Sequence, residues 1–140
     1  MPRISRLFIK SGMVYLMLGV ILALIADIPN FDTGIHLLPV YWHMIVIGWI
    51  TQVIMGVSIW MFPGRTRRKT PVDSFYSKAA FWLLNSGLIL RFITEPFLPR
   101  FQGNTLLVII VILSVLLQIA AFAAYVAEIW PRLRPKKRRV

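Results

Sequence analysis

Four long apolar runs fill most of the 140-residue sequence, and they limit more than any other feature how this chain can fold. A helix needs ~20 mostly apolar residues to cross a bilayer. The runs are residues 8–28, 39–62, 76–95 and 104–130. Hydrophobic residues make up 58% of the chain, whereas soluble domains have roughly 45–50%. We therefore predict an all-α fold, an antiparallel bundle of four transmembrane helices that forms a single integral membrane domain over residues 1–140.

Positive charge is distributed unevenly along this chain. There are 16 lysines and arginines and only five acidic residues, which gives a net charge of +11. All but two of the basic residues, Arg91 and Arg100, lie around the start of the first run, around the connection between the second and third runs, or after the fourth run. Basic loops are retained in the cytoplasm. We therefore predict that both termini lie on the cytoplasmic side of the cytoplasmic (inner) membrane of a bacterium or archaeon.

The basic tail, residues 131–140, has two interpretations. One is a topology anchor that contacts lipid headgroups, and the other is a docking segment for an acidic partner. No nucleic-acid-binding motif accompanies the charge, so the expected partner is the lipid bilayer and not nucleic acid.

Several chemistries are excluded by missing residue types. Without cysteine the chain cannot form zinc–thiolate sites, iron–sulfur clusters or a covalent c-type haem link. No G-x-S-x-G or H-E-x-x-H motif occurs, and the six methionines include no M-x-x-M cluster for copper. We therefore predict no catalytic residues, and whether the chain is an enzyme stays open.

His43 lies near the outer end of the second run, four residues after Pro39. At 1.5 Å per residue it is ~6 Å into the helix, in the outer leaflet. Titratable groups at membrane depth are costly and are therefore functional candidates, and imidazole is a common haem ligand. His43 is therefore a candidate ligand for a metal or a haem; the alternative is that it only forms a hydrogen bond with a neighbouring group. The only other histidine, His36, is a weak metal candidate, because Pro39 places it in the outer loop and two helical turns would separate it by ~10.5 Å from His43.

Arg91 and Glu95 lie near the outer end of the third run. Because the second and third helices run in opposite directions, we expect Arg91 in the same leaflet as His43. The i, i+4 spacing allows Arg91 to form an ion pair with Glu95. The alternative is that Arg91 binds a cofactor by holding an anionic group such as a haem propionate. Both hold if Glu95 also orients the guanidinium.

Gly48, Gln52 and Gly56 share one face of the second helix at four-residue spacing. Small residues let a neighbouring helix approach closely, so helix packing is one interpretation. The other is that a flat macrocycle lies against this face, since Gly48 is only five residues from His43. On that interpretation Gly48 and Gln52 are cofactor-binding residues.

A longer pattern also runs through the second helix. It is H-x4-G-W followed by G-x3-W-x2-P, formed by His43, Gly48, Trp49, Gly56, Trp60 and Pro63. The pattern resembles helix two of subunit I in the haem–copper oxidase superfamily, nearest to the nitric-oxide-reductase and C-family oxidase branches. The resemblance implies that His43 is an axial ligand of a low-spin haem b toward the outer face, that the N-terminus is cytoplasmic, and that the protein serves electron transport in a respiratory chain.

The chain departs from that family in having four helices and no histidine after His43. In the family, the copper ligands and the other haem ligands lie on later helices. The resemblance therefore does not extend to reduction of oxygen or nitric oxide by this chain alone. The second axial position would be open, filled by a methionine or by His36, or supplied by another subunit, such as a second His43 in a homodimer.

These expectations lead to three candidate functions. The leading one is a membrane b-haem protein that transfers electrons or serves as a small subunit of a respiratory complex. The first alternative is a haem-free accessory or assembly subunit, in which His43 only forms hydrogen bonds between helices. The second is a haem-based sensor of nitric oxide. A small transporter is the weakest class, because neither a broken helix nor an inverted repeat is present.

Overall fold

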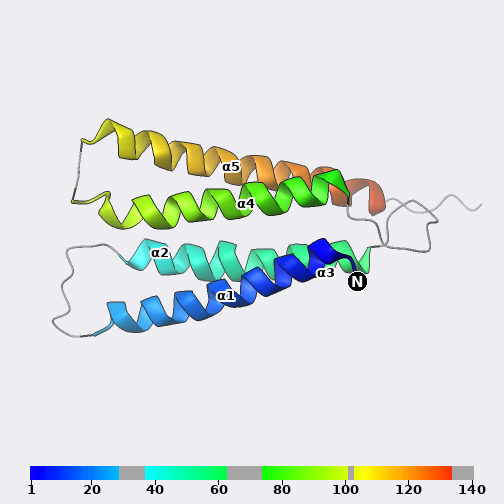
Figure 1. The fold of residues 1–140 in the computed structure, drawn as a ribbon, viewed down its shortest axis with the longest axis horizontal. Helices are drawn as coiled ribbons and strands as arrows, with labels where there is room; N and C mark the ends of the chain where they lie inside the picture. Colours follow the sequence, from blue (N-terminus) through cyan, green and yellow to red (C-terminus); the bar gives the residue numbers. More distant parts are fainter. Residues whose placement is uncertain (29–36, 63–73, 101–102, 134–140) are drawn as a thin grey trace, which may run out of the picture.

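A computed structural model describes residues 1–28, 37–62, 74–100 and 103–133, and within these ranges every regular element is a helix (Figure 1). The elements are α1 (Arg3–Ala26), α2 (Leu38–His43), the π-helix η1 (Met44–Thr51), α3 (Gln52–Met61), α4 (Phe75–Thr94), the 3-10 turn η2 (Glu95–Phe97), α5 (Thr105–Ile129) and the 3-10 turn η3 (Trp130–Arg132). Helices α2, η1 and α3 follow one another without a break, so four long rods make up the bundle. The predicted all-α, four-helix fold is confirmed.

Three of the four rods are long and apolar enough to cross a membrane, namely Arg3–Ala26, Leu38–Met61 and Thr105–Arg132. The remaining predicted span corresponds to α4, which has 20 residues but carries Lys78, Asn85 and Arg91 within its length. Among the polar residues of α4, Ser77 and Asn85 are buried. A helix with neighbours on several sides can hold such groups because they find partners there.

The rods pack as two hairpins, α1 with the α2–η1–α3 rod and α4 with α5 (Figure 1). Glycines allow the close approach within the first hairpin. A Cβ atom added to Gly48 would lie 2.8 Å from Cβ of Tyr15, and one added to Gly56 would lie 2.9 Å from Cβ of Phe8. In the second hairpin, a Cβ added to Gly87 would lie 2.9 Å from the carbonyl oxygen of Ser114. The glycine face of the second helix thus packs closely against α1.

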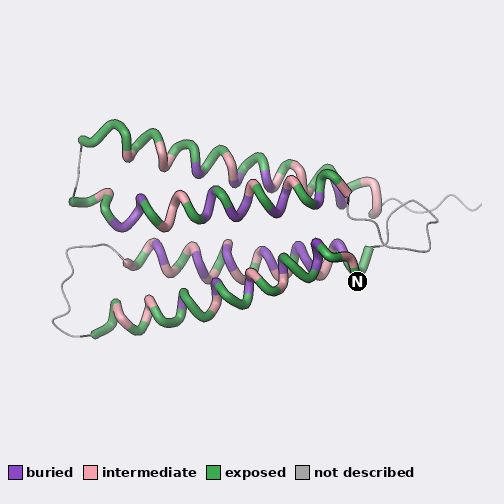
Figure 2. The backbone as a smooth tube through the Cα atoms, viewed as in Figure 1, coloured by how far each residue is buried: buried purple, intermediate pink, exposed green. Residues whose placement is uncertain are grey.

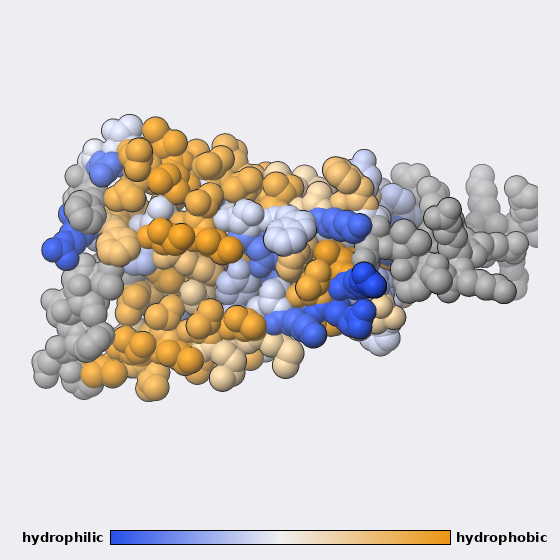
Figure 3. All heavy atoms as spheres, in the orientation of Figure 1, coloured by the Kyte–Doolittle hydropathy of each residue, from blue (hydrophilic) through white to orange (hydrophobic). Residues whose placement is uncertain are grey.

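The interior of the bundle is small and the exterior is apolar. Phe8, Met55, Leu84 and Leu88 have almost no exposed surface, and buried positions line the facing sides of the rods (Figure 2). Many large aliphatic side chains point outward, where in a bilayer they would contact lipid. In Figure 3, apolar residues cover most of the length of the visible face, and hydrophilic residues gather mainly toward the end that carries the N-terminus.

Polar caps begin the two helices of the second hairpin. Ser74 precedes α4 and accepts a hydrogen bond from the backbone N–H of Ser77 (3.1 Å), and Asn104 precedes α5 and accepts one from the N–H of Leu106 (3.0 Å). Such caps satisfy backbone donors that a helix start leaves free. Gly103, just before the second cap, has a positive φ of 93° and makes the turn into α5 possible.

Candidate functional site

His43 is the last residue of α2, and its ring is anchored by its own helix. Nδ1 lies 2.7 Å from the carbonyl oxygen of Pro39, one turn earlier. A carbonyl oxygen only accepts hydrogen bonds, so Nδ1 carries a proton, and in the neutral ring the lone pair is then on Nε2. No hydrogen bond from a described residue reaches Nε2, and the side chain is 25% exposed. His43 is therefore partly exposed, and its Nδ1 is the nitrogen held by its own helix.

A π-helix begins directly after His43 and runs for eight residues, Met44–Thr51. The hydroxyl of Thr51 donates to the carbonyl oxygen of Val46, five residues earlier, at 2.8 Å. Wider helical turns of this kind are rare and are often found at functional sites. The wider turns of the π-helix also change which of the residues after His43 share a helix face. A regular α-helical period does not predict these faces.

Glu95 connects His43 to Arg91. Its Oε2 lies 3.1 Å from Nδ1 of His43, and its Oε1 is 3.2 Å from Nε and 3.1 Å from Nη2 of Arg91. The predicted ion pair between Arg91 and Glu95 is present, and the structure brings His43 and Arg91 together at the same end of the bundle. The contact of Glu95 with His43, which lies 52 positions earlier in the chain, was not predicted from the sequence.

The carboxylate of Glu95 is unevenly satisfied. The residue is buried, with 8% of its surface exposed. Oε1 accepts from Arg91, but Oε2 makes no hydrogen bond of good geometry with any described residue, although Nδ1 of His43 is close to it. Likewise, no hydrogen bond within the described part of the chain uses Nη1 of Arg91. Oε2 of Glu95 and Nη1 of Arg91 thus form no hydrogen bond with the described residues.

Gln52 and Gly48 are occupied by contacts between helices. Gln52 is fully buried; its Oε1 accepts from the hydroxyl of Ser11 (2.6 Å) and its Nε2 donates to Oδ1 of Asn85 (3.2 Å). The same Asn85 oxygen accepts from the hydroxyl of Tyr15 (3.0 Å), whose Cβ abuts Gly48. This geometry leaves neither Gln52 nor Gly48 open to a ligand, so it favours packing over the cofactor-binding role expected for them.

Asn85 is the polar residue of this network that sequence reasoning missed. It stands in the middle of the third apolar run, and a polar side chain at that depth was the available signal. His36, the weak metal candidate, lies outside the described residues. Within the described ranges no group of three or more His, Cys, Asp or Glu side chains could hold a metal ion. A site of several protein ligands around one bare metal ion is therefore not assembled there.

Comparison with protein families gives one match, to the model described as NnrS protein, over residues 6–137. The chain belongs to the NnrS family. Members of the NnrS family are generally membrane proteins that bind haem and are linked to the nitric oxide response. No curated protein and no solved structure matches the chain. Nothing in these comparisons connects it to the haem–copper oxidases, so that resemblance stays a prediction.

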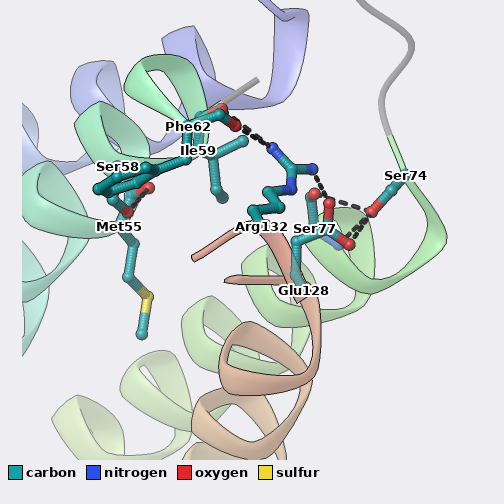
Figure 4. A network of polar contacts seen from close by, with 8 residues as sticks. All are labelled: Met55, Ser58, Ile59, Phe62, Ser74, Ser77, Glu128 and Arg132. Atoms are coloured by element: carbon teal, nitrogen blue, oxygen red, sulfur yellow. Dashed lines mark hydrogen bonds and ion pairs between the residues drawn. The ribbon is translucent and has the colours of Figure 1, made fainter. Parts of the chain in front are cut away.

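This NnrS chain has a second polar cluster at the opposite end of the bundle, where α3 ends, α4 begins and α5 ends (Figure 4). Nη1 of Arg132 donates to the carbonyl oxygens of Phe62 (2.8 Å) and Ile59 (3.2 Å), and Nη2 pairs with Glu128. Glu128 also accepts from the hydroxyl of Ser74. The cluster ties the two hairpins together by capping the free carbonyls at the end of α3.

Proposed function

We propose that this chain binds haem b through Nε2 of His43. The observation that carries the proposal is the 2.7 Å contact between Nδ1 of His43 and the carbonyl oxygen of Pro39, which in the neutral ring puts the proton on Nδ1 and the lone pair on Nε2. Histidines that bind metals almost always donate their other ring N–H to a carbonyl or carboxylate, which fixes the tautomer. A b-type haem is the choice that suits a chain without cysteine, because no covalent thioether link can form.

The residues beside His43 also fit a haem. At the same end of the bundle, Nη1 of Arg91 forms no hydrogen bond with any residue that the structure describes, and a guanidinium pairs well with a carboxylate such as a propionate. Its pairing with Glu95 keeps the pair electrically neutral in the absence of another anion. Haem, when bound, would supply an iron atom that binds small gases or accepts one electron.

Two roles are open to a haem held in this way, and the family favours the first. With His43 as its single protein ligand, the iron would keep one position free for a gas, which suits a nitric oxide sensor or carrier in a family linked to the nitric oxide response. The second role is electron transfer, as a homodimer or as a small subunit of a respiratory complex. It is supported by the partial exposure of His43, which a second chain with its own histidine can approach.

The proposed orientation places this site away from the cytoplasm. The basic residues around residues 1–10, 65–78 and 132–139 favour a cytoplasmic position for both termini, in the cytoplasmic membrane of a bacterium or archaeon. His43, Glu95 and Arg91 would then face the outer leaflet, where gas or an electron partner arrives from outside the cell.

Absorption spectroscopy of the protein purified in mild detergent tests the proposal. We expect a Soret band in the oxidised protein, sharpened α and β bands after dithionite, and a pyridine haemochrome spectrum of haem b. His43→Ala should lose the haem, whereas the matched His36→Ala should keep it. A colourless, folded preparation from haem-replete cells would instead favour the haem-free accessory subunit. Full haem content in His43→Ala would refute ligation by His43.

A further inference from the structure

We infer that Glu95 is a positioning residue. It accepts a hydrogen bond from the Nδ1–H group of His43 and thereby sets how strongly Nε2 donates its electron pair to a metal. The inference rests on the proposed function and deepens it. It assigns Glu95 the task of tuning the ligand, which is separate from the task of fixing its tautomer, already performed by the Pro39 carbonyl.

The first support is the unsatisfied oxygen of Glu95. Oε2 is buried and lacks a hydrogen bond from the described residues, yet it lies 3.1 Å from Nδ1 of His43. A buried acceptor left without a donor costs ~1–3 kcal/mol, and more when it is charged. The nearest donor is the N–H of His43, which at present points to the Pro39 carbonyl. A small turn of the imidazole ring would let both oxygens share that proton and would satisfy Oε2.

The second support is the clamp on the other oxygen. Arg91 holds Oε1 with two guanidinium nitrogens at 3.2 and 3.1 Å from one turn earlier on the same helix. That clamp fixes the carboxylate so that Oε2 faces α2, not solvent. It also keeps Glu95 ionised near an apolar interior, because the guanidinium compensates its charge. The carboxylate is thus held in place and in its charged form beside the imidazole.

The chemical consequence is an electron-rich ligand. A carboxylate that accepts the Nδ1 proton raises the basicity of the opposite nitrogen, and such outer-shell partners typically change metal affinity 10–100-fold. Greater donation from Nε2 favours the more highly charged ferric iron. Because His43 belongs to the first hairpin and Glu95 follows α4 of the second, the strength of the ligand also depends on how the two hairpins sit against each other.

The test replaces Glu95 by its neutral isostere. Glu95→Gln keeps the size of the side chain and one acceptor oxygen for Arg91, so folding should survive, but it puts an NH2 group, which cannot accept the ring N–H, in place of Oε2. Glu128→Gln is the matched control, because Glu128 belongs to a buried glutamate–arginine pair at the far end of the bundle. We expect Glu95→Gln to keep its haem, to prefer the ferric state about tenfold less, which raises the potential by about 59 mV, and to lower the iron–histidine stretching frequency in resonance Raman spectra. Glu128→Gln should leave both unchanged.

A second arm uses the haem-free protein and separates failure of this inference from failure of the proposed function. In protein labelled with ¹⁵N-histidine, the ring N–H of His43 should resonate downfield and shift upfield in Glu95→Gln but not in Glu128→Gln. An unchanged potential and stretching frequency in haem-loaded Glu95→Gln would overturn the role of Glu95 while leaving haem binding intact. If the wild type binds no haem, an unchanged ring resonance in Glu95→Gln would overturn the contact itself.

Discussion

The two ends of the bundle carry the same pair of residues and use it differently. At one end Arg91 and Glu95 pair across one turn near the end of α4, and at the other Glu128 and Arg132 pair across one turn at the end of α5. In the second pair the remaining donors and acceptors bind fixed groups of the chain, two carbonyls of the α3 end and the hydroxyl of Ser74. In the first pair, Oε2 of Glu95, which is close to His43, and Nη1 of Arg91 form no hydrogen bond with the described residues.

The two ion pairs differ in the groups that surround them. The Arg91–Glu95 pair lies next to His43, and the Glu128–Arg132 pair contacts the carbonyls at the end of α3 and the hydroxyl of Ser74. Glu95 is the C-cap of α4, where the helix dipole disfavours an anion by ~0.3–1 kcal/mol. At that position its Oε2 lies 3.1 Å from Nδ1 of His43. Arg132, by contrast, adds positive charge where helix ends expose carbonyls, a favourable arrangement in its own right. One end therefore contributes to stability, and the other is the end where we propose that haem binds.

The largest effect on stability is expected from disrupting the Glu128–Arg132 pair. Arg132→Gln should lower the free energy of unfolding by ~3–5 kcal/mol, because it leaves buried Glu128 without its counter-ion and the end of α3 without its cap. Thermal or SDS unfolding in detergent measures the change, with exposed Arg6→Gln as the control. Haem bound per folded molecule should not change. A loss of haem at full stability would mean that the two ends have been assigned the wrong roles.

The next largest effect, on haem affinity, is expected at the end of the bundle with His43, Arg91 and Glu95. Arg91→Gln keeps a donor for Glu95 but removes the charge that a propionate would meet, so haem affinity should fall about tenfold or more. Titration of the haem-free protein with haemin measures this affinity. Unfolding of Arg91→Gln, followed as for Arg132→Gln, should show the smaller loss of stability of the two. Equal haem affinity in Arg91→Gln and wild type would exclude the propionate role.

The smallest effect is expected between the ends, in the network of Tyr15, Gln52 and Asn85. Asn85→Leu removes the acceptor that both other side chains use. Hydrogen bonds between membrane helices contribute only ~0.6–2 kcal/mol, so unfolding should become easier by about that much. Exposed Ser86→Ala serves as the control. The Soret band should be unaltered, and a shifted band in Asn85→Leu would show that the network reaches the haem site.

The helices were predictable because apolar runs of membrane length leave few alternatives. The predicted runs 39–62, 76–95 and 104–130 end within two residues of the helices observed, Leu38–Met61, Phe75–Thr94 and Thr105–Ile129. The first helix begins five residues before the predicted start, at Arg3. Its basic side chains extend a helix beyond the apolar part, because their long stems keep the charge in water.

The site was only half predictable, for a geometric reason. The pairing of Arg91 with Glu95 follows from the spacing along one helix. The contact between Glu95 and His43 joins two helices, so it depends on the rotation of each about its axis, which the sequence does not specify. The π-helix after His43 changes the rotation of the residues that follow, and within it Gly48 packs against Tyr15.

Chemical rescue tests most directly the central claim that Nε2 of His43 ligates haem. His43→Gly removes the ligand and leaves space for a free imidazole. We expect this variant to be purified without haem, and to recover a Soret band when haemin and imidazole are added together but not with haemin alone. The wild type should need no imidazole. Haem retained by His43→Gly, or binding of haemin to it that does not depend on imidazole, would contradict the account.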